Sequence, residues 1–233
     1  MKAIRRKHPI RMVRYSEGGP ADRMMSEQER QEAEMRLAMA AGEQQNRFVS
    51  EGVDGEIRVL KESDPMAAQY IEDELFADVG FNPEGGADAS KHAWSAATVS
   101  DLATAFDPSF EGSARHSDYI RRAFQDEGNY KADKINNRTD FKPGDILFMG
   151  RKDSEGNELG PQKFRQFRRD AAGKGEFGGE DGYGSHSDII VSTGTDKGGT
   201  YYNVQGGNVA DGLYTRKMYA RDLANKYAGR LTQ

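Results

Sequence analysis

The sequence predicts an α+β fold in which helices come first and a small antiparallel sheet follows. Runs rich in helix formers, with apolar residues at helical spacing, fill much of the chain up to residue 124. From residue 145 onward, β-branched and aromatic runs bounded by glycine replace them. The chain contains no cysteine, which excludes disulfides, thiolate metal ligands and cysteine nucleophiles.

Residues 1–50 are expected to form an extended basic arm followed by an amphipathic helix, separate from a main domain over residues 51–233. The first 25 residues hold seven Lys or Arg against one Glu and one Asp, so the arm carries +5 in a chain of net charge -5. Such an arm can bind nucleic acid, an anionic surface or an acidic partner. Only Tyr15 is available for base stacking, so nucleic acid is disfavoured and anchoring to other subunits of a larger assembly is expected.

The helix of this arm begins with a capping box. "SEQE" (26–29) places Ser26 as the N-cap and Glu29 three residues later. The apolar stripe that follows, with Ala33, Leu37 and Ala41, is thin. A stripe of this kind is typical of a helix that lies on a partner or on a domain surface.

The main domain is predicted to open with a turn and a short strand over residues 50–62. The helices expected next are 65–80, started near Pro65 and stopped by Gly80, then 91–106, capped by Asp88 or Ser90, and 117–124. The strands expected are 145–150, 187–193, 200–205 and 213–218, with a hairpin turn at 194–199 and a closing helix at 219–229. Residues 151–185 interrupt the sheet, either as a solvated insertion or as a lid or substrate wall.

Ser95 is the first candidate for chemistry. In the helix "KHAWSAATVSDLATAF" (91–106) it shares a stripe with Val99, Leu102 and Phe106, so it is expected to face the interior near the helix N-terminus. Free backbone N–H groups and the positive end of the helix dipole stabilise negative charge there. Ser95 is therefore either a nucleophile beside an oxyanion pocket or a small packed side chain.

His186 is the candidate base. It stands at the start of the strand "SHSDIIVSTG" after a glycine-rich loop, where an imidazole can act as a general base. On the next strand Asn203, Gln205 or Asn208 can accept from that imidazole and fix its tautomer. The paired glycines Gly206 and Gly207 indicate either a close approach of the backbone to another group or a tight turn that ends the strand.

Four blocks carry a resemblance to a known superfamily: "WSAATVS" (94–100), "ARHSDYIRRAF" (114–124), "PGDILFMGR" (143–151) and "HSDIIV" with "GGNVADGLYTRK" (186–217). Their order resembles that of papain-like bacterial cell-wall peptidases and amidases of the NlpC and CHAP types. More closely, they are similar to an uncharacterised bacterial subgroup that carries Trp-Ser-Ala where the others carry Trp-Cys-Ala. The resemblance covers about residues 60–218 and implies a papain-like fold.

The resemblance implies a role for several residues. Ser95 takes the nucleophile position and His186 the base position, while the third position falls to Asn208, with Gln205 as runner-up. Trp94, His116, Gly206 and Gly207 are possible cleft residues, and His116 is more simply a hydrogen-bonding core residue. Asp145 is expected to cap a turn. Because a serine hydroxyl stays protonated where a thiol ionises, the histidine must remove its proton during attack.

Two functions follow from these observations. The first is hydrolysis of peptide or amide bonds in peptidoglycan, with Ser95, His186 and Asn208 or Gln205 as catalytic residues and the peptidoglycan peptide as substrate. The second is a catalytically silent structural or binding module of a phage tail or virion, anchored by residues 1–50.

The sequence also bears on location and cofactors. It contains no run of about 20 apolar residues that could span a membrane and no apolar segment after its basic N-terminus that would form a secretion signal. Synthesis in the cytoplasm, with incorporation into a phage particle, is therefore expected. No cofactor is expected, and the four histidines show no spacing that indicates a metal site.

Overall fold

The computed structural model of the chain describes residues 25–51, 56–83, 86, 88–125, 127–135, 140–152, 154–157 and 184–233. Its main element is a six-stranded antiparallel sheet in the order β3-β8-β4-β5-β6-β7. The strands are β3 (Lys131–Lys134), β4 (Ile146–Gly150), β5 (Ser185–Asp196), β6 (Gly199–Val209), β7 (Gly212–Tyr219) and β8 (Gly229–Thr232). The prediction of an α+β fold with an antiparallel sheet is confirmed.

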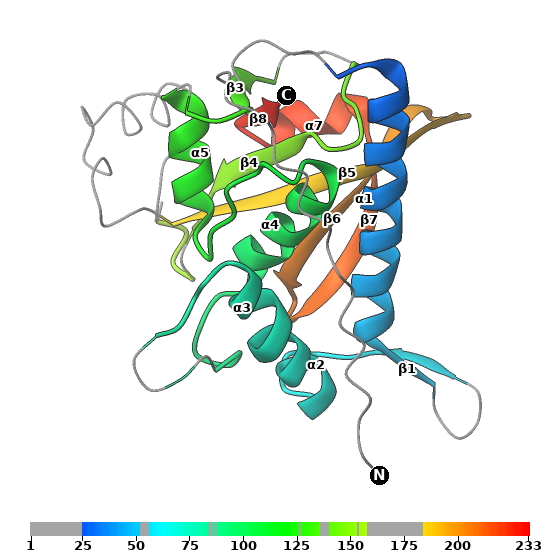
Figure 1. Cartoon of the computed structure of the whole chain (residues 1–233). Coiled ribbons are helices and arrows are strands. Elements are labelled where there is room, and N and C mark those ends of the chain that lie inside the picture. The colour runs from blue at the N-terminus through cyan, green and yellow to red at the C-terminus, as the bar shows by residue number, and fades with distance from the viewer. Residues whose placement is uncertain are drawn as a thin grey trace.

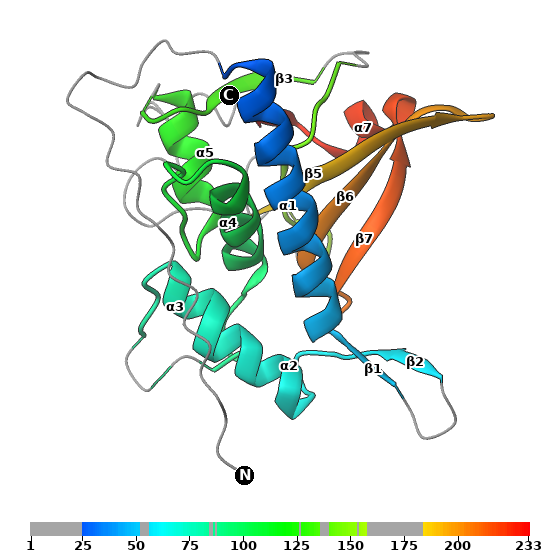
Figure 2. The ribbon, with the colours of Figure 1, turned by 45° about the vertical axis from the view of Figure 1, so that its right-hand side comes forward.

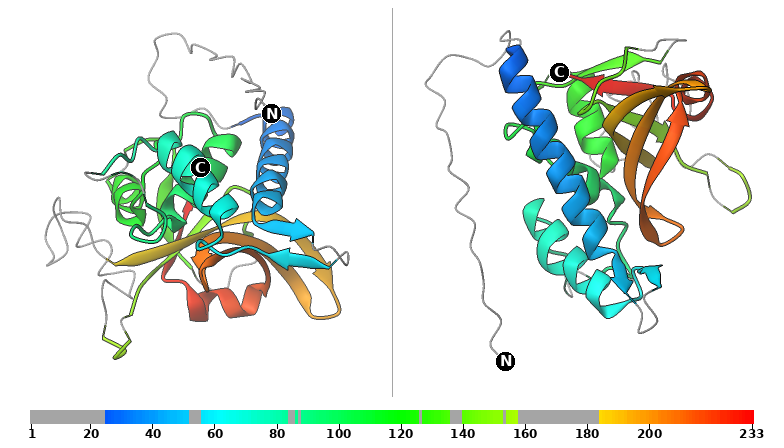
Figure 3. Two further views of the ribbon diagram at one scale, coloured as in Figure 1. Left: turned by 90° about the horizontal axis from the view of Figure 1, so that it is seen from below. Right: turned by 90° about the vertical axis from the view of Figure 1, so that its right-hand side faces the viewer.

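Helices cover both faces of the sheet. The helices α1 (Glu27–Arg47), α4 (Ser95–Phe106) and α5 (His116–Phe124) lie on one face (Figure 1), and the short α7 (Ala220–Lys226) lies on the other (Figure 3). On the first face, α4 packs against α1 and lies on β5 and β6, while α1 and α5 also contact the sheet themselves.

A second group of elements closes one end of the molecule. α2 (Pro65–Tyr70) continues through a π-helical turn, η1 (Ile71–Leu75), into α3 (Phe76–Asp78), and this continuous helix lies below α4 (Figure 2). A small hairpin, β1 (Val49–Glu51) and β2 (Ile57–Val59), extends beside it.

The alternation of side chains along the strands builds the core on both faces of the sheet. On β4, Ile146 and Phe148 pack in the cluster that contains α1, α4 and α5, whereas Leu147 packs in the opposite cluster with Leu223 and Tyr227. Successive strand residues point to opposite faces, so one strand serves both clusters.

Of the two places expected for α1, a partner or a domain surface, the structure shows the domain surface. The predicted capping box of Ser26 and Glu29 is present, but the helix is not an appendage, because Ala33, Leu37 and Ala41 are buried in one cluster with α4 and the sheet. The thin stripe suffices because small side chains allow the helix to approach closely. Residues 27–47 thus pack with the main domain, and residues 1–24 lie outside the described residues.

Several element boundaries also differ. The central helix begins at Ser95 instead of residue 91, and neither Asp88 nor Ser90 caps it. The strands β3 and β8 were not expected, and the closing helix ends at Lys226 instead of residue 229. Within the expected insertion at 151–185, residues 153 and 158–183 lie outside the described residues. No helix in the described ranges is long and apolar enough to cross a membrane.

Candidate active site

The start of α4 is anchored by Trp94, the N-cap residue of the helix. Its side chain is fully buried, stacks on Phe48 with ring centroids 5.0 Å apart, and donates from Nε1 to Glu62 at 2.8 Å. The hydrophobic contact and the hydrogen bond together fix where the helix begins. Trp94 is therefore a core residue that positions the next residue, Ser95.

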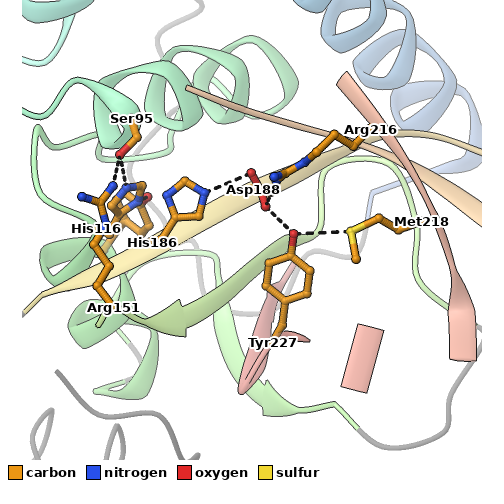
Figure 4. A network of polar contacts seen from close by, with 9 residues as sticks. Ser95, His116, Arg151, His186, Asp188, Arg216, Met218 and Tyr227 are labelled. Carbon is orange, nitrogen blue, oxygen red and sulfur yellow. Dashed lines mark hydrogen bonds and ion pairs between the residues drawn. The ribbon is translucent and has the colours of Figure 1, made fainter. Parts of the chain in front are cut away.

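Ser95 lies at the first position of α4 and is 1% exposed. Its Oγ is 2.7 Å from Nε2 of His116, the first residue of α5, and it accepts a hydrogen bond from Arg151 Nη2 at 3.3 Å. The other ring nitrogen of His116, Nδ1, is hydrogen-bonded to the hydroxyl of Tyr119. These contacts connect the ends of three elements, α4, α5 and β4, around one hydroxyl group (Figure 4).

The environment of His116 favours its neutral form. Burial, and then the electrostatic effects of the neighbouring His186 and Arg151 side chains, lower the pKa of His116 well below its ordinary value, against the opposing effect of Asp188. Burial also raises the pKa of Tyr119, so its hydroxyl stays protonated. The hydroxyl of Ser95 thus faces a neutral imidazole whose second nitrogen is held by a neutral phenol.

His186 lies beside this pair. Its ring centroid is 5.3 Å from that of His116, and its Nε2 is 3.3 Å from Oδ1 of Asp188, two residues along β5. Its other nitrogen, Nδ1, is buried and has no hydrogen-bond partner among the described residues. The partner expected for Ser95 was His186, but the histidine that bonds to the Ser95 hydroxyl here is His116. Ser95 and His116 lie on different helices, so their spacing along the chain did not predict this contact.

Asp188 is the centre of a second buried network. It is 0% exposed, and Oδ2 accepts from Arg216 Nη2 at 2.6 Å and from the Tyr227 hydroxyl. Burial acts to raise the pKa of Asp188, but the hydrogen bond and electrostatic effect of His186, the positive charge of Arg216 and the hydrogen bond from Tyr227 outweigh burial and hold the pKa well below its usual range. Asp188 is therefore a carboxylate at neutral pH.

The paired glycines of β6 allow two close approaches. A Cβ on Gly206 would lie 1.8 Å from Oδ1 of Asp188, and a Cβ on Gly207 would lie 2.3 Å from Oγ1 of Thr98 and 2.6 Å from the Trp94 ring. Of the two readings of these glycines, the structure shows the close approach. One glycine makes room for the carboxylate and the other for the first turn of α4.

The polar residues of β6 do not contact His186 through the hydrogen bonds that the structure describes. Gln205 is fully buried and bonds to Gln44 at 3.0 Å and Thr215 at 2.8 Å, while Asn203 donates to Ser192 at 2.8 Å. Asn208 adopts a left-handed conformation with φ 55° near the end of β6. The group that bonds to the His186 ring is Asp188, from the same strand.

Three residues of this cluster were not anticipated: Tyr119, Arg151 and Asp188. Two of them had a signal, because i and i+3 share a helix face, as in His116 and Tyr119, and i and i+2 share a strand face, as in His186 and Asp188. Asp145 caps a turn as expected, since its side chain accepts from the backbone N–H of Lys142 at 3.0 Å. Among the residues that the structure describes, no group of three or more His, Asp or Glu is arranged to hold a metal ion.

Comparison with known protein families gives a match over much of the chain. A model of a bacterial family described as "Uncharacterized protein conserved in bacteria (DUF2272)" matches residues 80–225. That range includes the site from Ser95 to Arg216 and leaves out α1 and Tyr227. No curated protein and no solved structure matches the chain. Because the matched range covers more than half of the sequence, this chain belongs to the DUF2272 family.

Proposed function

We propose that this chain hydrolyses amide or peptide bonds in peptidoglycan, with Ser95 as the nucleophile and His116 as its general base. The observation that carries the proposal is the hydrogen bond of 2.7 Å between Ser95 Oγ and His116 Nε2. A nucleophile and base within about 2.6–3.2 Å of each other, with the base held by a third group, form the arrangement that serine hydrolases use. Here the third group is Tyr119.

The proton positions in this arrangement suit a base. In a neutral imidazole with its hydrogen on Nδ1, that hydrogen points to the Tyr119 hydroxyl and the lone pair of Nε2 accepts from Ser95. As Ser95 attacks a carbonyl carbon, its proton moves to Nε2, and the same proton then passes to the leaving amine. The phenol thus takes the orienting role that a carboxylate takes in Ser-His-Asp triads.

Negative charge that develops during attack has two sources of support. The first backbone N–H groups of an α-helix have no intrahelical partner, and Ser95 opens α4. The guanidinium of Arg151, 3.3 Å from Ser95 Oγ, adds a positive charge at the same point. Both would stabilise the oxyanion of a tetrahedral intermediate.

The substrate class and the papain-like fold rest on the sequence resemblance to cell-wall peptidases and amidases. The order of a helix that begins with the nucleophile, followed by an antiparallel sheet with a histidine at the start of a strand, supports this assignment. The base differs from the one implied by the resemblance, because His116 on α5 bonds to Ser95. His116 is therefore proposed as the base because of its distance from Ser95, and peptidoglycan as the substrate because of the sequence resemblance.

Purified muropeptides provide the test. The wild type should release products that Ser95→Ala does not release, while Ser100→Ala should behave like the wild type. Ser100 is a matched control because it is buried on the same helix and its hydroxyl bonds to the backbone of Ser113 instead of a histidine. Equal absence of products from folded wild type and Ser95→Ala would refute the proposal.

A second candidate function is favoured by the burial of the pair. Ser95 is 1% exposed and His116 is 6% exposed, so a substrate must displace protein to reach them. A module of a phage particle that retains the fold needs no such access, and residues 1–24 would anchor it. Because α1 packs in the core, the deletion that tests this function must end at residue 24. Loss of incorporation into the particle with an unchanged melting temperature is the expected result, and unimpaired incorporation would refute this function.

A further inference from the structure

The cluster around Ser95 contains a second imidazole whose orientation is set by a carboxylate. Asp188 is fully buried and accepts hydrogen bonds from three side chains: His186, Arg216 and Tyr227. An ionised carboxylate only accepts hydrogen bonds. The ring nitrogen of His186 that faces Asp188, Nε2, must therefore carry a hydrogen.

This requirement leaves the other nitrogen as an acceptor. In its neutral form an imidazole has one N–H, so with that hydrogen on Nε2 the lone pair of His186 is on Nδ1. Nδ1 is buried without a hydrogen-bond partner among the described residues, and buried polar atoms without a partner are rare in folded proteins. The ring lies between the Ser95–His116 pair and Asp188 (Figure 4), so this unfilled acceptor belongs to the same cluster.

We infer that Asp188 is a positioning residue that keeps the proton of His186 on Nε2, so that Nδ1 accepts a proton from the water that hydrolyses an acyl group on Ser95. This inference rests on the proposed function. The water oxygen bonds to the acyl carbon and one water proton moves to Nδ1. When the bond between the acyl carbon and Ser95 Oγ breaks, its electron pair stays on Oγ, which takes that proton from Nδ1. The acid leaves, and Ser95 and His186 return to their starting forms.

The two histidines differ in ways that suit this division of roles. A second proton on the ring of His116 would lie near the guanidinium of Arg151, and Nδ1 of this ring stays bonded to Tyr119. His186 has one open nitrogen, and a positive charge on its ring would lie beside the carboxylate of Asp188. The second proton transfer is thus better supported at His186.

The sheet itself is shaped to admit this carboxylate. A Cβ on Gly206 would overlap Oδ1 of Asp188 at 1.8 Å, so any other residue there would push the carboxylate away from Nε2. Gly206→Ala therefore disturbs the position of Asp188 without changing a polar group.

Acyl transfer from p-nitrophenyl acetate separates the two steps. In Asp188→Asn we expect the first release of nitrophenol to persist, while steady turnover falls by about 100-fold or more and acetylated Ser95 accumulates in the intact-protein mass spectrum. Gly206→Ala and His186→Gln should show the same accumulation. Asp196→Asn, on the same strand but exposed and paired with Lys217, should behave like the wild type. Wild-type turnover in folded Asp188→Asn would overturn the inference.

A second measurement does not depend on turnover. Long-range nitrogen–proton correlation NMR should show His186 with its hydrogen on Nε2 in the wild type and a shift of that hydrogen toward Nδ1 in Asp188→Asn, because an amide can donate to Nε2. A wild-type ring with its hydrogen on Nδ1 would overturn the inference. Failure of the wild type to become acetylated at Ser95 would instead refute the proposed function, and the tautomer would still decide the role of Asp188.

Discussion

Replacing Gly207 with alanine tests whether β6 lies against the first turn of α4 as closely as described. The added Cβ would lie 2.3 Å from Oγ1 of Thr98 and 2.6 Å from the Trp94 ring, whereas carbon atoms in contact are about 3.5–4.0 Å apart. Trp94 has little room to move, because it is fully buried and stacked on Phe48. Overpacking of this kind costs about 1–3 kcal/mol or more.

The assay is thermal and urea unfolding of Gly207→Ala beside a control, Gly42→Ala. For a chain of this size, the loss corresponds to a melting temperature lower by about 2–12 °C. A Cβ on Gly42 would meet nothing within 4 Å, and alanine in a helix is favoured over glycine by about 0.5–1 kcal/mol, so the control should be slightly stabilised. A Gly207→Ala variant as stable as the wild type would refute the close approach.

Three further predictions concern stability. Burial raises the pKa of Asp145 to about 6 from 3.8, so the folded chain binds this proton more tightly than the unfolded chain does. As pH rises from about 4 to about 6, ionisation of Asp145 should therefore lower the free energy of unfolding by about 3 kcal/mol. Asp145→Asn should remove this pH dependence in urea titrations, and an unchanged pH profile would contradict the prediction. Arg216→Met removes the guanidinium at 2.6 Å from the buried Asp188 and leaves His186 and Tyr227 as its donors. The free energy of unfolding, measured in urea, should fall by about 3 kcal/mol, and a loss too small to measure would argue against the ion pair. Ser26→Ala removes the capping box of α1 and should lower the same quantity by about 1 kcal/mol; no change would show that the cap contributes little.

The parts of the fold that the sequence could predict are those with a local pattern. The glycine-bounded runs at 145–150, 187–193, 200–205 and 213–218 correspond to β4, β5, β6 and β7. β3 and β8 have only four residues each, and β8 pairs with β3 and β4, far away in the chain. Their stability comes from contacts with these distant partners. For example, a Cβ on Gly229 of β8 would lie 2.4 Å from the ring of Phe148 on β4, so only glycine lets the two approach so closely. No local pattern encodes such pairing.

In the site, too, the features set by a local sequence pattern could be predicted, and those set by contacts between distant segments could not. The interior position of Ser95 followed from the helical stripe, and the structure places it at 1% exposure. The choice between His116 and His186 as its partner depends on how α5 packs beside α4, which spacing along the chain does not determine. The third group was sought on the neighbouring strand, but the period of the strand itself places Asp188 beside His186.

The most direct test of the claim that His116 makes Ser95 nucleophilic is covalent labelling with a fluorophosphonate, followed by peptide mass mapping. The account predicts a single adduct on Ser95 in the wild type and a labelling rate lower by about 100-fold or more in folded His116→Gln. An unmodified Ser95 in the wild type, or an undiminished rate in His116→Gln, would contradict it.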